Sequence, residues 1–500
     1  MVKVPAPTRV IVAVLPCLAI ACAPAFLRRG GPPVTHGVAV GEVTPSTAVV
    51  WARCERQSHV RVTVDEPGRP AVLSASAAAP PAHDYTAHVR LDGLRPETRY
   101  RYQVWCLDDP ADTPDPAAGV AGSFRTAPDD EHPAAVRFIW GGDVAGQNTC
   151  RDRTDGYLIF RTINDRAPDF FIGLGDMIYA DDPCLPTGRY GNQQIPGPAQ
   201  PASDLPAFWS YWKYNRDDEA LRQLLAATPY YGVWDDHEVL NDFDPQHDVG
   251  AVPPYPPDRH LLPIGLQAFV DYNPFPDAVQ TSHRLYRAVR WGRHVELFLL
   301  DTRQYRDPNS APDDTAHPKT MLGTEQLAWL KEGLRTSDAT WKVIVTSVPL
   351  SVPTGSTERG RDGWANFDHS TGFEHELLDI VEFLRARDIN NTIWISTDIH
   401  FAAVFRDTPF ADAPKFQLYE IDTGPLNAGV LPKTEVDVTL HPQQLFHFPD
   451  NADPAQGFEQ AKSWFNFGEV RVDAAGDLAV DIINSGGKRL YTLSLRPSRP

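Results

Sequence analysis

The sequence predicts an N-terminal β-sandwich over residues 34–128, followed by a layered α/β domain over residues 135–500. In the first part, apolar and polar residues alternate with a period of two, as they do in half-buried strands. In the second part, short continuous apolar runs alternate with amphipathic helical segments, which is typical of buried strands in a layered α/β domain. A chain of 500 residues is also too long for one ordinary core.

The sandwich strands follow from this alternation. "GVAVGEVTPSTAVVWARC" predicts two strands around a turn at Pro45–Ser46, and "HVRVTV", "TAHVRL" and "SFRTAP" predict further strands. "LDGLRPETRYRYQVWC", with Tyr100 and Tyr102, resembles the tyrosine-corner region of fibronectin type III domains. We interpret this part as a packing or shielding module; a ligand-binding sandwich is the alternative.

The strands of the second part are predicted from six apolar runs: "VRFIWGGD", "DFFIGLGD", "YYGVWDD", "VELFLLD", "WKVIVTS" and "NTIWISTD". Helices are predicted over Thr324–Thr336 and Phe373–Arg387. Several runs end in aspartate, and ligands of such sheets gather beyond the carboxyl ends of the strands. We therefore expect a group of aspartates to meet at one rim: Asp143, Asp176, Asp235, Asp236, Asp301 and Asp398.

The N-terminus has the pattern of a secretory signal peptide over residues 1–23. Lys3 and Arg9 precede an apolar stretch from Val10 to Ala21, which is too short to span a bilayer comfortably. "AIAC" resembles a lipoprotein box with a lipid anchor at Cys22, and "ACA" is an alternative cleavage site. No other apolar run is long enough for a transmembrane helix, so we expect an exported protein in the periplasm, at the cell surface or secreted.

Six cysteines are present, and Cys17 and Cys22 fall in the signal. Cys54, Cys106, Cys150 and Cys184 remain, and an even number suits an oxidising compartment. Their order and placement suggest Cys54–Cys106 and Cys150–Cys184, although sequence permits three pairings.

The net charge of −19 argues against a nucleic-acid-binding surface. It also means that an anionic substrate needs local cations, either arginines or metal ions, to offset the general repulsion.

Acidic residues are concentrated in "VWDDHEVLND", where Asp235, Asp236 and Glu238 surround His237. Such carboxylates repel one another unless a positive partner lies among them. "GGDV", "GDMIY" and "STDIHF" add carboxylates, a phenol and an imidazole at other strand ends. These hard, oxygen-rich ligands suit Fe³⁺, Ca²⁺, Mn²⁺ or Mg²⁺. Two such ions are able to clamp a phosphoryl group and activate water.

The ordered series "GGD", "GDMIY", "WDDHE", "DTRQYR", "DGW" and "STDIHF" resembles the PhoD-type alkaline phosphatases. These belong to the calcineurin-like metallophosphoesterase superfamily and are related to purple acid phosphatases. The resemblance runs from about Val34 to the C-terminus. It implies a fibronectin- or immunoglobulin-like sandwich followed by an αββα metallophosphoesterase domain.

The resemblance also implies a first metal site for Fe³⁺ (or Mn²⁺), with Asp143, Tyr179 and His400 as ligands. Asp176 would bridge both metals. The family often carries a cysteine where Asp143 stands, and this aspartate makes Mn²⁺ an alternative to iron.

At the second site, Asp236 and Asp398 replace neutral ligands of the superfamily by anionic oxygens. The superfamily's middle histidine is absent, and Thr346 or Ser347 occupies its place. These differences favour Ca²⁺ at the second site. His237 would be the catalytic residue, contacting phosphoryl oxygens or protonating the leaving group.

Three further residues are candidate substrate contacts, each with a structural alternative: Asn148 (a turn), Arg303 (a pair with Asp301) and Trp364 (a loop anchor). Trp364 lies with Asp362 on a Gly-rich loop that we expect over the site.

Other acidic residues are expected to have supporting roles. Asp181 and Asp182 are interpreted as an exposed acidic turn, with binding of a further ion as the alternative. Glu238 and Asp242 are interpreted as charges that support the ligands or start a helix, rather than as ligands. The loops at 183–206 and 244–263 are expected to decide the substrate.

Together these features predict an exported metal-dependent phosphoesterase that acts on small-molecule phosphate esters with metal-activated water. We expect an alkaline phosphatase for phosphate acquisition; a phosphodiesterase or phospholipase D-like enzyme of the same family is the alternative. A non-catalytic surface binding protein is a more distant one.

Overall fold

The computed structural model describes residue 1 and residues 31–66, 68, 73–248, 255, 260–356, 360–365 and 371–498. The predicted signal peptide, apart from Met1, and the candidate lipid anchor at Cys22 lie outside the described residues. Among the residues that are described, none of the helices has the length and apolarity of a membrane span.

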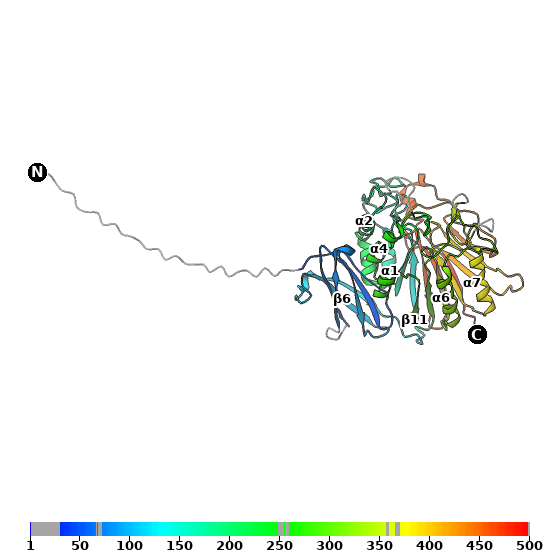
Figure 1. Ribbon diagram of the computed structural model, residues 1–500, viewed down its shortest axis with the longest axis horizontal. Coiled ribbons are helices and arrows are strands. Elements are labelled where there is room, and N and C mark those ends of the chain that lie inside the picture. The colour runs from blue at the N-terminus through cyan, green and yellow to red at the C-terminus, as the bar shows by residue number, and fades with distance from the viewer. Residues whose placement is uncertain are drawn as a thin grey trace.

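The N-terminal part is the expected β-sandwich, drawn in blue in Figure 1. One sheet contains β1 (Val34–Gly41), β2 (Thr47–Cys54) and β5 (Thr86–Asp92). The other has the order β4 (Leu73–Ala79), β3 (Ser58–Asp65), β6 (Arg99–Leu107) and β7 (Val120–Arg125). Two 3₁₀ turns lie at Pro81–His83 and Pro116–Ala118. The Cys54–Cys106 disulfide links β2 to β6 across the core, as predicted.

The tyrosine corner is present. The Tyr100 hydroxyl accepts a hydrogen bond from the Arg95 amide at 2.8 Å, which fixes the turn before β6. Tyr102 also lies in the sandwich core, and its hydroxyl donates to the Ala226 carbonyl at 2.9 Å. Both rings pack in the sandwich core, but the Tyr100 hydroxyl fixes a turn of the sandwich whereas the Tyr102 hydroxyl joins the sandwich to the second part.

The second part contains two stacked sheets. The first continues the sandwich sheet through one parallel bridge between Gly41 and Tyr230, in the order β22-β21-β20-β8-β9-β10-β1-β2-β5. Its further strands are β8 (Val136–Gly141), β9 (Phe170–Leu174), β10 (Tyr230–Val233), β20 (Asn466–Val472), β21 (Leu478–Asn484) and β22 (Arg489–Leu495).

The second sheet has the order β11-β12-β13-β16-β18-β17-β19. Its strands are β11 (Arg287–Trp291), β12 (Val295–Leu299), β13 (Trp341–Val345), β16 (Thr392–Ser396), β17 (Ala402–Asp407), β18 (Leu418–Asp422) and β19 (Pro442–Phe448). A small hairpin joins β14 (Gly355–Ser356) to β15 (Gly360–Arg361).

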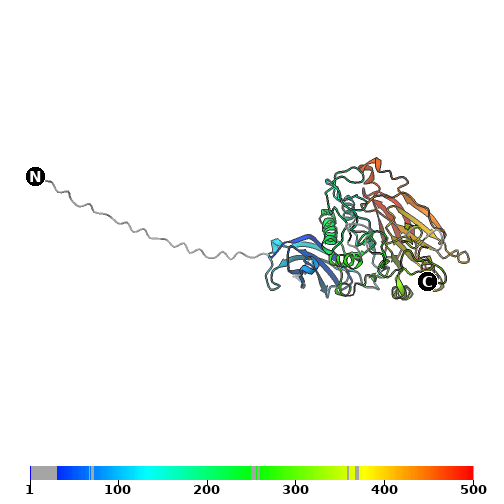
Figure 2. The same cartoon turned by 45° about the horizontal axis from the view of Figure 1, so that its top comes forward.

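Helices cover the outer faces of the two sheets, which gives the αββα order (Figures 1 and 2). On the side of the sandwich lie α1 (Leu158–Arg166), α2 (Leu205–Arg216), α3 (Glu219–Ala227), α4 (Leu262–Tyr272) and α5 (Asp277–Ser282). On the other side lie α6 (Gly323–Thr336) and α7 (Glu374–Ala386), close to the predicted bounds. A short α8 (Phe458–Ala461) follows a 3₁₀ turn at Pro454–Gln456.

Strand β9 shows why both faces of the sheet are apolar. Phe170, Ile172 and Leu174 point into the core between the two sheets, whereas Phe171 joins the core beneath the helices. A continuous apolar run is therefore what a strand buried on both faces requires. The predicted αββα order is confirmed by these separate cores.

Candidate metal centre

The predicted metal ligands lie where parallel strands of both sheets end. Asp143 follows β8, Asp176 follows β9, Asp236 follows β10, and Asp398 and His400 follow β16. Four of them adopt left-handed backbone conformations, with φ of 61° at Asp143, 52° at Asp176, 75° at Asp398 and 58° at His400. Such conformations are uncommon for residues with side chains and cluster at functional sites.

The first ligand group contains Asp143, Asp176 and His400, whose ligand atoms lie within 4.8 Å of one another. Nδ1 of His400 donates to the Gly429 carbonyl at 2.5 Å, which leaves the lone pair on Nε2. Nε2 lies 2.7 Å from the Tyr179 hydroxyl and 3.6 Å from Asp143 Oδ1. Burial lowers the pKa of His400 to about 4, so the ring is neutral and suited to bind a cation.

The second ligand group shares Asp176 with the first. It contains Asp176, Asp235, Asp236 and Asp398, and His237 lies within the same distance of Asp176 and Asp236. Because Asp176 belongs to both groups, it stands where a bridging carboxylate is needed. A third group, Asp236, Asp242 and Asp362, adjoins the second.

The carboxylates of these groups fit metal ions because several of their oxygens lack other partners. Within the described part of the chain, no hydrogen-bond partner reaches either oxygen of Asp143, or Oδ2 of Asp176, Oδ1 of Asp236 and Oδ2 of Asp398. Burial raises the pKa of Asp143, Asp176 and Asp398 well above the usual range. Buried carboxylates without partners are costly, and a bound cation removes that cost.

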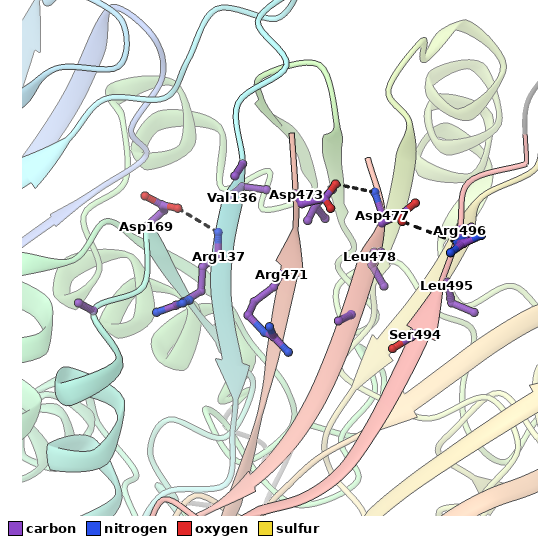
Figure 3. A pocket seen from close by; sticks show the side chains of 14 residues that line it. Val136, Arg137, Asp169, Arg471, Asp473, Asp477, Leu478, Ser494, Leu495 and Arg496 are labelled. Carbon is purple, nitrogen blue, oxygen red and sulfur yellow. Dashed lines mark hydrogen bonds and ion pairs between the residues drawn. The ribbon is translucent and has the colours of Figure 1, made fainter. Parts of the chain in front are cut away.

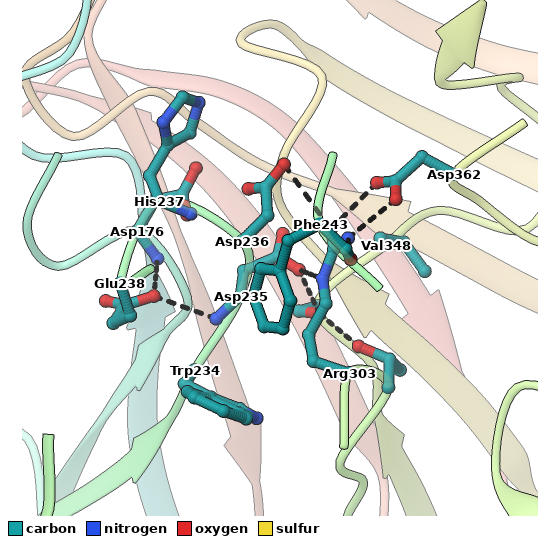
Figure 4. Close-up of polar contacts among 12 residues, drawn as sticks. Asp176, Trp234, Asp235, Asp236, His237, Glu238, Phe243, Arg303, Val348 and Asp362 are labelled. Carbon is teal, nitrogen blue, oxygen red and sulfur yellow. Dashed lines mark hydrogen bonds and ion pairs between the residues drawn. The ribbon is translucent and has the colours of Figure 1, made fainter. Parts of the chain in front are cut away.

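Glu238 holds the turns that present the ligands (Figure 4). Its carboxylate accepts the amides of Asp176 at 3.0 Å, Met177 at 2.7 Å and Asp235 at 2.8 Å, and the side chain is fully buried. This confirms the supporting role expected for Glu238.

His237 is held by Asp181. The distance from His237 Nδ1 to Asp181 Oδ1 is 2.6 Å, and Asp181 Oδ2 accepts the Asn241 amide at 2.9 Å. Burial alone would lower the pKa of His237, but the charges of Asp181, Asp236 and Asp176 raise it well above its usual value. The interpretation of Asp181 as an exposed acidic turn was wrong, because its side chain is 11% exposed and paired with His237.

Arg303 has a structural role, but not with the partner that we expected. The guanidinium binds Asp235 at 2.6 Å and Asp362 at 2.6 and 2.8 Å, and it is fully buried (Figure 4). Asp301 instead accepts hydrogen bonds from Trp234 and from the turn at 303–304. It therefore does not join the ligand groups, and Arg303 has no surface that a substrate reaches.

Trp364 and Asn148, the other two candidate substrate contacts, also make the structural contacts that were given as their alternative roles. Trp364 is fully buried, and its Nε1 donates to Thr346 Oγ1 at 3.1 Å. The Asn148 amide group donates to the Thr187 carbonyl and accepts from Leu185 N and Gln194 Nε2, each at 3.0 Å. These bonds hold the loop that the Cys150–Cys184 disulfide also joins, with the predicted pairing.

A cavity of about 250 Å³ opens beside the second ligand group. Asp236, His237, Asp242, Asp398 and His400 line one side of it. The described residues of the loops at 183–206 and 244–263, which we expected to decide the substrate, do not line it. Further lining comes from residues 352–355, 431–432 and 434, which sequence analysis did not single out.

A larger hollow of about 830 Å³ lies at the other end of β8, around Arg137 and Asp169 (Figure 3). Asp169 accepts the Arg137 amide at 2.9 Å, and Asp477 pairs with Arg496. Because this hollow lies at the end of β8 opposite to the ligand groups and its charged groups bind one another, it is a weaker candidate site than the rim.

Comparison with known proteins gives one consistent family. The PhoD-like phosphatase family matches residues 138–479, and the N-terminal domain of PhoD-like phosphatases matches residues 21–128. Alkaline phosphatase D of Bacillus subtilis (strain 168) is 25% identical over 407 residues, which cover 74% of this chain and 64% of that protein. The match therefore spans slightly less than two thirds of this relative.

Solved structures share the fold. The structure of PhoD has a TM-score of 0.70 and 19% identity, covering 94% of this chain and 93% of that one. A purple acid phosphatase from yellow lupin (Lupinus luteus) seeds has a TM-score of 0.61 and 12% identity, covering 93% of this chain and 74% of that one.

Proposed function

Because the chain belongs to the PhoD-like phosphatase family, we propose that it is an exported, metal-dependent phosphoesterase that releases phosphate from small phosphate esters. The observation that carries this proposal is the group of buried carboxylate oxygens without partners around Asp176, together with the neutral Nε2 of His400. Export is supported by the predicted signal peptide and by two disulfides.

We assign the first metal site to Asp143, Tyr179 and His400, with Asp176 shared between both sites. Oxygen ligands with one imidazole suit Fe³⁺ or Mn²⁺. Asp236 and Asp398 would hold Ca²⁺ at the second site, because the group of four around them, Asp176, Asp235, Asp236 and Asp398, offers carboxylate oxygens. When bound, such a pair lowers the pKa of water and offers positive charge to the phosphoryl oxygens.

The side chains of the protein supply the rest of the chemistry. His237 faces the cavity with Nδ1 bound to Asp181, so its Nε2–H is available to donate to a phosphoryl oxygen or to the departing oxygen. Asp181 keeps the ring protonated and fixes its orientation. The carboxylates of Asp236 and Asp242 repel an anion that arrives without metal, so turnover requires loaded sites.

The deciding test compares two chromogenic substrates on the metal-loaded mature protein at alkaline pH with Ca²⁺. Faster hydrolysis of the nitrophenyl phosphate monoester than of the bis(nitrophenyl) diester is expected for a phosphatase that supplies phosphate. A preference for the diester would indicate instead that the protein is a phosphodiesterase of the same family. No hydrolysis of either, with metal bound, would contradict the enzymatic proposal and favour a surface binding protein.

A further inference from the structure

The lining of the cavity beside the metal ligands combines polar and apolar residues. One part of its lining is an apolar wall, which we define as Val352, Pro353, Ile399, Phe401, Leu431 and Pro432, beside the carboxylates, the histidines and the polar side chains of Gln147, Asn241, Thr354 and Thr434. The polar ligands are placed to hold a phosphate group. The apolar wall is therefore the surface that the remaining part of a substrate meets.

The inner part of the wall is rigidly built. Val352, Ile399 and Phe401 belong to a small hydrophobic cluster with Ala403 and Phe405, and they are 1%, 4% and 2% exposed. Such a packed cluster does not rearrange to offer polar groups. The chemical character of this side is consequently fixed by the fold.

The outer part of the wall stands at the mouth of the cavity. Leu431 is 38% exposed, which is unusual for a large apolar side chain here, and Pro432 is exposed beside it. The Leu431 amide lies 3.4 Å from the His400 carbonyl, so this loop is attached to the turn that carries the ligands. Ile399 and Phe401 flank His400 in the chain. A phosphate held by the ligands thus lies within reach of the wall.

The charges of the residues that line the cavity also favour a substrate whose organic group carries no negative charge. Among the described residues that line it there is neither lysine nor arginine, while Asp236, Asp242 and Asp398 are acidic. Lys433, next to Pro432, directs its ammonium group to Gln444 Oε1 at 2.6 Å. His237 is the proposed partner of the phosphoryl group itself, so a second anionic group on the substrate would meet carboxylates with no lysine or arginine among these residues to bind it.

We propose that the apolar wall binds the organic group of the substrate and selects phosphate esters whose organic group is uncharged and apolar, alkyl or aryl. This inference rests on the proposed phosphoesterase function and names the substrate class of the same site. Polar esters such as those of polyols, and esters that carry further phosphates, are disfavoured. Selection by burial is gradual, because one methylene contributes about fourfold in affinity when fully buried and about twofold on a one-sided wall.

The test measures binding of alkylphosphonates, which are not hydrolysed, to the metal-loaded full chain by calorimetry. Methyl-, propyl- and pentylphosphonate are compared, with dihydroxypropylphosphonate as a polar match for the propyl compound and carboxypropylphosphonate as a charged one. The dissociation constant is expected to fall about two- to fourfold per methylene. The polar and charged compounds are expected to bind no better than methylphosphonate.

Two variants of the same loop locate the effect. Leu431→Asn is expected to reduce the affinity ratio of pentyl- to methylphosphonate at least threefold. Val438→Asn is the matched control, because Val438 is 67% exposed and outside the cavity lining, and it should leave that ratio unchanged.

Two results would overturn the inference. Equal affinities along the alkyl series in the unmodified protein would remove the apolar selection while leaving the phosphoesterase proposal intact. Failure of even methylphosphonate to bind the metal-loaded protein would reject the phosphate site itself, and the present inference with it.

Discussion

The pair formed by Asp181 and His237 shows how one side chain sets the properties of another. Asp181 lies two residues after Tyr179 and binds His237 Nδ1 with one oxygen and the Asn241 amide with the other. Its charge keeps His237 protonated at pH values where an isolated imidazole is neutral. The Asp181 charge thereby favours the protonated form of the proposed proton donor.

Asp181→Asn should shift the alkaline limb of the pH–kcat profile to lower pH. His237 loses its proton as pH rises through its pKa, and removing the Asp181 charge lowers that pKa. We also expect kcat to fall roughly 10- to 100-fold, at or below the usual contribution of a general acid because His237 itself is retained, with metal content unchanged. The measurement is kcat against pH together with elemental analysis.

Asp182→Asn is the matched control, because Asp182 binds the Gln147 amide instead of His237. An alkaline limb that stays in place in Asp181→Asn would show that Asp181 has only a structural role.

Gly146 leaves room for the proposed phenolate ligand. A Cβ at this position would lie 2.4 Å from Cζ of Tyr179, so Gly146→Ala must displace the ring. We expect the protein to lose most of the first metal, measured by elemental analysis after gel filtration. Gly486→Ala serves as control, since its nearest contact would be an ordinary 3.5 Å. Full metal retention in Gly146→Ala would argue against Tyr179 as a ligand.

At the scale of single residues, the sequence identified the chemically active side chains more reliably than it identified the residues that pair with them. Asp143, Asp176 and His400 stand in recognisable local motifs, and the structure brings them together. The pairing of Arg303 with Asp362 joins residues 59 positions apart, and no local pattern encodes it. Asp181 was missed for the same reason, because its burial depends on His237 from another loop.

Among the elements, α7 stabilises the start of α6. Glu376 in the first turn of α7 accepts the amides of Met321 at 3.0 Å and Leu322 at 2.9 Å, and also the Thr320 hydroxyl. These amides precede α6, whose N-cap residue Leu322 makes no side-chain cap. This arrangement buries a carboxylate, and its burial raises the pKa of Glu376 to about 7.

This shift predicts a pH dependence of stability. Because the pKa of Glu376 is raised in the folded state, its contribution is fully present below about pH 4.5 and is lost as pH rises to about 7. The difference between the ordinary glutamate pKa of 4.5 and a pKa of about 7 corresponds to about 3 kcal/mol. Glu376→Gln should therefore raise the melting temperature relative to the unmodified protein at pH 8 more than at pH 5.

Glu382→Gln, an exposed position of the same helix, is the control and should show no such difference between the two pH values. Equal effects of Glu376→Gln at pH 5 and pH 8 would contradict a raised pKa.

The elements that sequence predicted share strong local signals. The six apolar runs are strands, and α6 and α7 match their amphipathic periodicity. Strand β4, with the sequence "LSASAAA", was missed because small residues give little hydrophobic contrast. The edge strand β22 has only one buried residue, Leu493, and its exposed and partly buried residues do not alternate clearly.

In the whole molecule, the sandwich is joined to the second part by a buried polar network as well as by the shared sheet. Arg53 binds Asp84 through two bonds of 2.9 Å, and Tyr272 of α4 donates to the same carboxylate at 2.5 Å. Arg216 of α2 lies over the Trp51 ring, 4.4 Å from its centroid. An interface of this kind supports the packing role predicted for the sandwich.

This attachment predicts that the two parts unfold together. Arg53→Met leaves Asp84 buried with Lys213 and Tyr272 as its remaining partners, and we expect a loss of about 2–3 kcal/mol, at or just below the usual range for breaking a buried pair. Calorimetry should show one transition at a lower temperature, and hydrolytic activity should disappear over the same range. Arg90→Met removes the exposed pair with Asp92 and should change the melting temperature little. Two separate transitions in Arg53→Met, with activity following only the later one, would mean that the sandwich unfolds independently and does not support the metal centre.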